Sequence, residues 1–450
     1  MGVSTFIQKI RQDSSTGRIF INVILLLSLN NINRVWKAIN MRKNVVLVGT
    51  FDTKGIEYKY VMGLFEELGI HVLTVNIGIY PTPFEGDITA DEIARIGGSS
   101  QRKLMEDNDR GAATATMSLG LSRLLPELCN KGFVDGVMSM GGSGGTAMAT
   151  AGMRTLPMGI PKIMISTMAG GNVAPYVGTS DIIMIPSIVD IAGLNTISRT
   201  VFRRGVMIMA GLLGCSSELK PDTSPVRPAI AATMYGVTTP CVTYAKEYLE
   251  QEGYEVIVFH ASGNGGRMME KLIRQGAFCG VLDITTTEWC DQLYGGIMAA
   301  GPHRSEAAAE GNVPQVVSVG ALDMVTFGPP ETVPEPYQSR KLYPHNPMIT
   351  IMRTTAEENQ ELGQILAEKL NQSKGNTILV LPLRGVSAVD AEGKVFYGPD
   401  EDRILFDTLR KKIDRDKVKL VEIDCHINDK EFGITAAKLL LQLINETKDK

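Results

Sequence analysis

From residue 44 onward, short runs of apolar and β-branched residues alternate with longer stretches in which apolar positions recur every three or four residues. The short runs predict buried strands, and the longer stretches predict amphipathic helices. Such an alternation is typical of βαβ units that build parallel sheets. In the first half, the predicted strands cover residues 45–48, 71–76, 136–140, 162–166 and 182–186, and the predicted helices cover residues 58–68, 114–131 and 146–155.

A second series follows an interruption at residues 215–228, which is rich in Ser and Pro and has no periodic apolar positions. Such a segment predicts a domain boundary. The fold class is therefore predicted as α/β, with two Rossmann-like doubly wound domains and mostly parallel sheets, over residues 41–220 and 221–450. The predicted strands of the second domain cover residues 229–234, 255–259, 280–284, 315–319, 348–352, 377–381 and 419–422, and its predicted helices cover 242–251, 266–274 and 357–370.

Two features modify this outline. Residues 328–347 contain six prolines and little apolar periodicity, and we expect a lid, an arm or a clasp between subunits there, because long irregular loops in compact domains are usually functional. The two halves also contain similar turns in the same order, which indicates a duplicated unit. The turn at 48–54 resembles the turn at 234–240, and the glycine-rich turn at 141–146 resembles the one at 261–267.

Composition narrows the class of protein. Hydrophobic residues make up 44% and charged residues 21% of the chain, as in globular proteins, and the net charge of -4 argues against a broad nucleic-acid interface. Six scattered cysteines without a CxxC pair fit a reducing compartment, so we expect a cytoplasmic protein. The apolar stretch at 19–29 is too short to cross a bilayer. We expect residues 1–40 to be a dispensable leader, with translation starting at Met41.

The first candidate site is the run GGSGGT at 141–146, which follows a predicted strand and opens a predicted helix. Free amides and the helix dipole at such a junction favour an anion, and glycines let the backbone approach phosphate oxygens. We expect hydroxyl hydrogen bonds from Ser143 and Thr146. The run lacks the Lys of the P-loop and does not match G-x-G-x-x-G, so a tight turn without any ligand remains the alternative.

Two further loops follow predicted strands. In the first, Asp52 is a candidate for a metal or a ribose hydroxyl and Lys54 for a phosphate, while the alternative makes Asp52 or Thr53 the N-cap of the next helix. The second contains Gly171, Asn172 and the run Gly178-Thr179-Ser180-Asp181, whose polar side chains are candidates for reading a sugar or a base. A polar connector without a ligand is the alternative for this second loop.

In the second half, polar residues fall at predicted strand ends. A histidine, carboxylates and arginines in such places are what an acid–base site for an anionic substrate needs. The candidates taken for catalysis are His260, Asp283, Glu288 and Arg353. The chain has five histidines and none of them has H-x-x-x-H spacing, so we do not expect a zinc site.

Long segments of the chain also resemble a known family. From about Lys43, the chain is similar to the family of the tomato mosaic virus resistance protein and its bacterial and fungal relatives. The segments that carry the resemblance are GGSGGT at 141–146, RTLPMGIPK at 154–162, GTSD at 178–181, PSIVDIAG at 186–193, YGVTTPC at 235–241, LDITTTE at 282–288, VGALDMV at 319–325, MRTT at 352–355, GVSAVD at 385–390 and HIND at 426–429.

The resemblance implies a two-domain α/β protein that binds ATP and Mg²⁺ and self-associates as a homo-oligomer, with a dimer expected. It places Mg²⁺ on Asp52. The antiviral role of the plant member is not carried over to this chain. The nucleotide site that the resemblance implies consists of Asp52, Thr53, Lys54, Gly142, Ser143, Gly144, Gly145, Thr146, Gly171, Thr179, Ser180 and Asp181.

Three hypotheses follow for function. The first is an ATP-binding protein with a catalytic or regulatory role. The second is a metabolic enzyme that acts on a phosphorylated or carboxylated small molecule, which the glycine-rich loop would hold. The third is a module that binds another protein and keeps its nucleotide for structural reasons. None of the three needs nucleic acid or a membrane.

Overall fold

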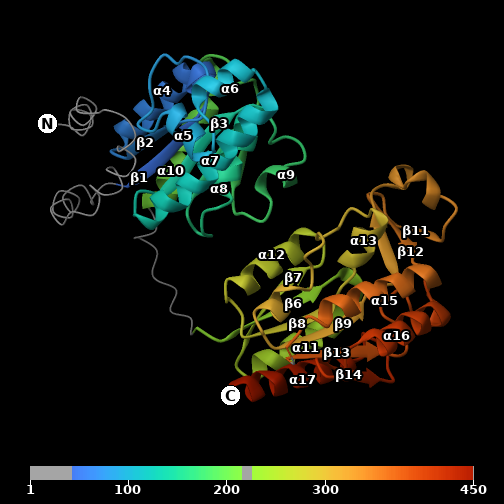
Figure 1. Cartoon of the computed structure of the whole chain (residues 1–450). Helices are drawn as coiled ribbons and strands as arrows, with labels where there is room; N and C mark the ends of the chain where they lie inside the picture. Colours follow the sequence, from blue (N-terminus) through green and yellow to red (C-terminus); the bar gives the residue numbers. More distant parts are fainter. Residues whose placement is uncertain (1–42, 215–225, 375, 449–450) are drawn as a thin grey trace. The chain divides into compact units, whose positions relative to one another are not determined.

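The computed structural model describes residues 43–214, 226–374 and 376–448, so the expected leader lies outside the described residues. The chain divides into two compact units, Met1–Pro221 and Asp222–Lys450. Each unit is built on its own parallel sheet with helices on both faces (Figure 1). The predicted α/β class with two Rossmann-like units is confirmed. Among the helices described, none is both long and apolar enough to cross a bilayer.

The N-terminal unit contains a five-stranded sheet in the order β2-β1-β3-β4-β5, and every neighbouring pair is parallel. β1, β3 and β4 are buried along their whole length, which is why their sequences are nearly continuous apolar runs rather than alternating ones. The five predicted strands agree with the observed ones to within a residue at each end. The strands are β1 (Asn44–Gly49), β2 (His71–Asn76), β3 (Gly136–Gly141), β4 (Lys162–Ser166) and β5 (Ile183–Pro186).

Helices cover both faces of this sheet. Residues Val46 and Val48 of β1 point into a core shared with α5, α7 and α8, whereas Val45 and Leu47 point into a core shared with α4 and α10. The helices are α4 (Phe51–Glu67), α5 (Ala90–Ile96), α6 (Gln101–Asp107), α7 (Arg110–Asn130), α8 (Ser143–Met153), α9 (Ala174–Val177) and α10 (Thr196–Gly214).

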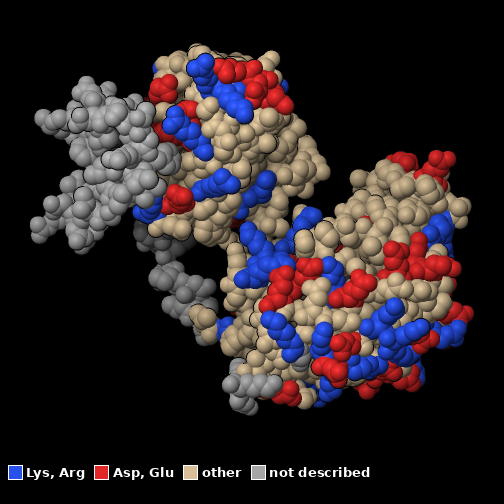
Figure 2. Space-filling view, viewed as in Figure 1, with Lys and Arg blue, Asp and Glu red and all other residues tan. Residues whose placement is uncertain are grey.

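The C-terminal unit has a six-stranded parallel sheet in the order β7-β6-β8-β9-β13-β14. α11 and α17 pack on one face and α15 and α16 on the other. On the viewed face of this unit, basic and acidic side chains intermingle, in agreement with the small net charge (Figure 2). The strands are β6 (Ala229–Met234), β7 (Glu255–His260), β8 (Gly280–Thr285), β9 (Gln315–Gly320), β13 (Thr377–Pro382) and β14 (Val418–Ile423). The helices are α11 (Thr239–Gln251), α12 (Asn264–Arg274), α13 (Glu288–Tyr294), α14 (Ala307–Glu310), α15 (Ala356–Leu370), α16 (Pro399–Lys412) and α17 (Lys430–Lys448).

A small antiparallel sheet corrects two expectations. It consists of β10 (Met324–Phe327), β12 (Ile349–Arg353) and β11 (Leu342–Asn346), in the order β10-β12-β11. The strand predicted at 348–352 therefore lies outside the parallel sheet. The proline-rich segment is not an irregular loop either, because it contains two 3₁₀ turns and the edge strand β11. Pro344 is tolerated in β11 because an edge strand leaves alternate N–H groups unpaired.

The two sheets repeat one topology. Read from the edge, β2-β1-β3-β4-β5 matches β7-β6-β8-β9-β13, and this is the order of doubly wound flavodoxin-like sheets. The matching strand order supports the predicted correspondence between the turns after β1 and β6. The predicted correspondence between the glycine-rich turns at 141–146 and 261–267 is wrong. β3 corresponds to β8, whereas the turn at 261–267 follows the edge strand β7. In each sheet the chain reverses its direction of winding beside the first strand, between β1 and β3 and between β6 and β8.

Candidate functional site

The carboxyl ends of β1 and β3 are held apart by Tyr58 of α4. The two strands pair from Val45 with Gly136 to Val48 with Ser139. At that point the Tyr58 hydroxyl accepts the Met140 N–H at 2.8 Å, and its single proton is within reach of the carbonyl oxygens of Met140 at 2.6 Å and Val48 at 2.8 Å. Burial raises the pKa of Tyr58, so the hydroxyl keeps its proton. These strand ends flank the switch point of the sheet, and doubly wound folds bind ligands in the crevice outside such a point.

Glycine makes this wedge sterically feasible. A Cβ on Gly49 would lie 2.0 Å from the Cζ atom of Tyr58. The aromatic ring therefore fills the space that a side chain at position 49 would need.

The glycine-rich loop lies on one side of this crevice. α8 starts at Ser143, and its N-cap residue, Gly142, provides no side-chain hydrogen bond. The amides of Ser143, Gly144 and Gly145 belong to the first turn, where a helix cannot satisfy its own N–H groups. Three donors and the positive end of the helix dipole thus lie together at the switch point, which is a suitable environment for an anion.

The hydroxyl of Thr146 has a different role from the expected one. Thr146 is buried, and its Oγ1 lies 2.7 Å from the Gly142 carbonyl oxygen and 2.7 Å from the Ser166 hydroxyl. The expectation that it donates to a phosphate does not agree with this geometry, because one helical turn places residue 146 against β4. Ser143, by contrast, is exposed.

Arg110 adds a charge that the sequence did not indicate. It is the first residue of α7, it is exposed, and its Nη2 lies 3.6 Å from the position that a Cβ on Gly144 would take. The guanidinium is thus next to the first turn of α8, where it reinforces the attraction for an anion. Arg110 belongs to no motif and lies more than thirty residues before the loop, so only the packing of α7 against α8 reveals it.

Asp52 lies on the other side of the crevice, in the first turn of α4. Its Oδ2 accepts the Tyr80 N–H at 3.1 Å, whereas its Oδ1 is buried and has no hydrogen-bond partner. Neither Asp52 nor Thr53 caps the helix, since the N-cap residue is Thr50 and the side chain of Asn76 accepts the N–H of Phe51 at 3.2 Å. The capping interpretation is therefore wrong.

The free oxygen of Asp52 fits a limited role toward Mg²⁺. Within the described part of the chain, no group of three or more His, Cys, Asp or Glu residues could hold a metal ion. Mg²⁺ bound with a nucleotide commonly takes one or two protein carboxylates, together with phosphate oxygens and waters. One carboxylate with an unpaired oxygen satisfies that requirement. Lys54 is not free for a phosphate in the same way, because its Nζ donates to the Ile191 carbonyl oxygen at 2.7 Å.

The remaining nucleotide candidates separate into two groups. Gly171 lies in the loop after β4, and Thr167 of the same loop, which was not a candidate, has its Oγ1 3.8 Å from the Cβ position of Gly142. Asp181, in contrast, forms an ion pair with buried Lys162 at 2.6 Å. Lys162 is the first residue of β4, so the run Thr179-Ser180-Asp181 lies at the amino edge of the sheet, opposite the crevice. Strand direction thus separates these residues from the glycine-rich loop.

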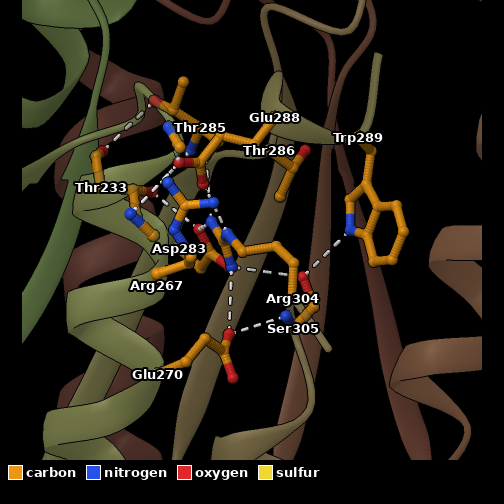
Figure 3. A network of polar contacts seen from close by, with 12 residues as sticks. Thr233, Arg267, Glu270, Asp283, Thr285, Thr286, Glu288, Trp289, Arg304 and Ser305 are labelled. Atoms are coloured by element: carbon orange, nitrogen blue, oxygen red, sulfur yellow. Dashed lines mark hydrogen bonds and ion pairs between the residues drawn. The ribbon is translucent and has the colours of Figure 1, made fainter. Parts of the chain in front are cut away.

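In the C-terminal unit, Asp283 and Glu288 lie together in a buried network (Figure 3). Both oxygens of Asp283 bind the guanidinium of Arg304 at 2.6 Å, and Glu288 Oε2 binds its Nε at 2.7 Å. Glu270 adds a third carboxylate at 3.4 Å. Burial raises the pKa of Glu270, while Arg304 opposes that shift. No sequence motif indicates Arg304, whose importance follows from these long-range contacts.

Glu288 also fills the glycine-rich turn before α12. Its Oε1 accepts the N–H groups of Gly263 at 2.6 Å and Gly266 at 3.2 Å. A Cβ on Gly266 would lie 2.1 Å from Glu288 Oε2, so the turn closes tightly around the carboxylate. An internal anion therefore satisfies this helix start, unlike that of α8.

Arg353 belongs to a second buried network. Its Nη2 donates to Asp402 at 2.9 Å and lies 3.8 Å from Asp390. Burial and Asp390 raise the pKa of Asp323 to about 7. His260, in contrast, is exposed at the end of β7, with its ring 5.4 Å from that of Tyr235. The four catalytic candidates thus do not converge: two share one network, one lies in another, and His260 lies at the surface.

Comparison with known proteins agrees with the division into two units. Residues 43–218 match the N-terminal domain of the uncharacterised protein family UPF0261, and residues 227–444 match its C-terminal domain. A UPF0261 protein of Clostridium tetani is 48% identical over 408 residues, which are 90% of this chain and 100% of that protein. A UPF0261 protein of Rhizobium meliloti is 44% identical over 404 residues, with 90% and 100% covered.

More distant similarities add little to this assignment. The ToMV resistance protein Tm-1 of Solanum lycopersicum is 43% identical over 337 residues, which cover 74% of this chain but 45% of that protein. A solved structure of a C2-type ketoreductase from a modular polyketide synthase aligns over 90% of this chain and 89% of that one, at 14% identity. Its TM-score of 0.21 is too low to indicate a shared fold. Both domain matches and the full-length bacterial relatives show that the chain belongs to the uncharacterised protein family UPF0261.

Proposed function

We propose that the N-terminal unit binds ATP with Mg²⁺ in the crevice between β1 and β3. The observation that carries the proposal is the uncapped start of α8 at the switch point of the sheet, with the guanidinium of Arg110 beside Gly144. The amides of Ser143, Gly144 and Gly145 would bind phosphate oxygens, and Arg110 would neutralise part of their charge. The resemblance to the resistance-protein family favours ATP over other anions.

Asp52 would be the protein ligand of the magnesium ion. Its unpaired Oδ1 lies beside Gly78 in the loop after β2, so the side chain would turn toward the glycine-rich loop to bind the ion. Mg²⁺ would supply charge neutralisation between the carboxylate and the phosphate oxygens. Tyr58 keeps the two strand ends apart and thereby positions both loops.

Titration calorimetry with ATP and Mg²⁺ tests the assignment on the wild type and two variants. A Cβ at Gly144 meets only Arg110 Nη2, at 3.6 Å, so Gly144→Val should fold normally while its side chain blocks the phosphates. Gly63→Val is the matched control, because its Cβ meets nothing within 4 Å and it lies farther along α4. We expect at least tenfold weaker binding for Gly144→Val and unchanged binding for Gly63→Val. Equal affinity in all three proteins would falsify the assignment.

The second hypothesis, an enzyme for a phosphorylated or carboxylated metabolite, gains nothing from the C-terminal candidates, because three of them are held in buried networks. A thermal-shift screen separates the two ideas, since a ligand that binds the native state raises its stability. Stabilisation by ATP supports the proposal, and stabilisation by sugar phosphates or small acids alone contradicts it. The proposed homodimer is checked by analytical ultracentrifugation of the full chain.

A further inference from the structure

Helix α10 of the N-terminal unit is apolar on two faces. Its inner face, with Val201, Phe202, Val206 and Met209, packs into the core beneath β3 and β4. Its outer face nevertheless carries four large apolar side chains that are exposed. Their exposed fractions are 47% for Ile197, 64% for Met207, 39% for Ile208 and 43% for Leu212.

Met207, Ile208 and Leu212 lie close together toward the end of α10, and Ile197 lies near its start. Met207 and Ile208 also line an open hollow of about 470 Å³, together with Thr200, Arg203 and Arg204 of the same helix. We call these exposed apolar residues and the hollow the outer face of α10. Helices that are apolar all round are normally buried, and contiguous exposed apolar surface usually marks an interaction site.

The charge on this face has a single sign. α10 contains three arginines and no Asp or Glu among its residues 196–214. Within the described part of the chain, no ion pair joins Arg203 or Arg204 to a carboxylate; Arg199 lies over the ring of Tyr60, 5.1 Å from its centroid. Whatever covers the outer face must therefore supply both apolar side chains and negative charge.

Two occupants from the chain itself do not meet this requirement. A second copy docked through the same face would bring Arg203 and Arg204 of both copies together without a carboxylate to separate them. Residues 1–42 contain six Lys or Arg and a single Asp, so that segment is also positively charged. Like charges brought into contact oppose association by several kcal/mol.

We propose that the outer face of α10 binds an acidic amphipathic helix of a partner protein. Leucine or isoleucine side chains of that helix would pack on Met207, Ile208 and Leu212, as the apolar face of an amphipathic helix packs on an apolar surface. Its Glu or Asp residues would pair with Arg203 and Arg204, whose planar guanidinium groups suit carboxylates. The inference does not depend on nucleotide binding, because it rests on a different helix and a different face.

The test uses the full chain and a synthetic 18-residue helical peptide. The peptide has Leu at every third or fourth position and Glu on the flanks, carries a fluorescein label, and is titrated by fluorescence anisotropy. We expect saturable binding that weakens with added salt. The double variant Arg203→Glu with Arg204→Glu should bind at least tenfold more weakly, and it should instead bind a peptide in which every Glu is replaced by Lys.

Matched controls separate docking from general attraction of charge. The double variant Lys103→Glu with Lys131→Glu makes the same change of charge at exposed positions of α6 and at the end of α7, and it should bind the acidic peptide like the wild type. A peptide of identical composition, scrambled so that it has no apolar face, should bind at least tenfold more weakly. Circular dichroism confirms that each variant is folded.

Three results would overturn the proposal. Equal binding of the scrambled peptide would show unspecific attraction. Binding to phosphatidylcholine–phosphatidylserine vesicles that depends on Arg203 and Arg204, without binding of the peptide, would assign the face to a lipid surface. A dimer of the wild type that dissociates in the Arg203→Glu, Arg204→Glu variant would assign it to a second copy.

Discussion

Replacing Arg304 by methionine would remove the cation that three buried carboxylates share. Arg304 is 1% exposed and binds Asp283 through two hydrogen bonds of 2.6 Å and Glu288 through one of 2.7 Å. Methionine has a similar length but no charge, so the carboxylates would remain buried without a partner. Removing one member of a buried ion pair typically costs about 3–5 kcal/mol. For a unit of this size, such a loss lowers the melting temperature by roughly 10 °C.

The stability that Arg304→Met loses should depend on pH, because the buried carboxyl groups can bind protons. Burial raises the pKa of Glu270 and Arg304 opposes that shift, so without Arg304 the pKa of Glu270 rises further above its value in the unfolded chain. The folded variant then holds protons that the unfolded chain releases, so its stability falls as pH rises above about 4.5. The difference between the wild type and Arg304→Met should therefore be larger at pH 8 than at pH 5.5.

Urea unfolding followed by the fluorescence of Trp289 measures this difference. Trp289 is buried beside the network and donates to the Ser305 hydroxyl at 3.3 Å, and Trp36→Phe makes it the single tryptophan of the chain. Arg384→Met is the control, because its ion pair with Asp424 is exposed at the surface of the same unit and should contribute far less to stability than Arg304 does. A loss below 1 kcal/mol for Arg304→Met, or a loss that does not change with pH, would refute this account.

Two further predictions concern buried polar groups. Tyr58→Phe leaves the amide and carbonyl of Met140 and the carbonyl of Val48 without their partner, so thermal unfolding should show a loss of about 2–4 kcal/mol. The control Tyr60→Phe should lose no more than about 0.5 kcal/mol. Similar melting temperatures for both variants would contradict this prediction. Because the folded-state pKa of Asp323 is raised to about 7, its contribution to stability is complete below about pH 4 and is lost as pH rises to 7. Asp323→Asn should reduce the fall in urea-unfolding free energy between pH 5 and 7.5, and an unchanged slope would show that Asp323 does not hold its proton.

The predicted strands were accurate because buried parallel strands are short apolar runs, a signal that lies in neighbouring residues. Some helices were missed for the corresponding reason. α10 has apolar residues on both faces, which weakens its periodic contrast, and α16 begins with acidic and ends with basic residues that conceal its buried positions Leu405 and Leu409. The role of Pro344 in an edge strand depends on its pairing with β12, which is a contact between segments.

The candidate site, too, was only partly predictable from neighbouring residues in the sequence. The glycine run at 141–146 and the acidic turn at Asp52 were identified from the chain alone, because a strand, a glycine-rich turn and a helix are consecutive in sequence. Arg110, Tyr58 and Arg304 were not, since each acts on residues between 10 and 82 positions away along the chain. Asp181 was assigned to the crevice until the direction of β4 placed it with Lys162 at the opposite edge.

The sequence by itself thus determined the α/β class, the two successive series of strands and helices, and the family to which the chain belongs. It could not decide which polar residues face a ligand and which stabilise the interior, because a carboxylate has the same chemistry in both places. Tertiary structure decided this by supplying the partner: Glu288 and Asp283 have Arg304 within 2.7 Å, whereas the first turn of α8 has no capping side chain. Burial makes an unpaired charge costly, so the interior pairs its charges and leaves the open donors at the switch point of the N-terminal sheet.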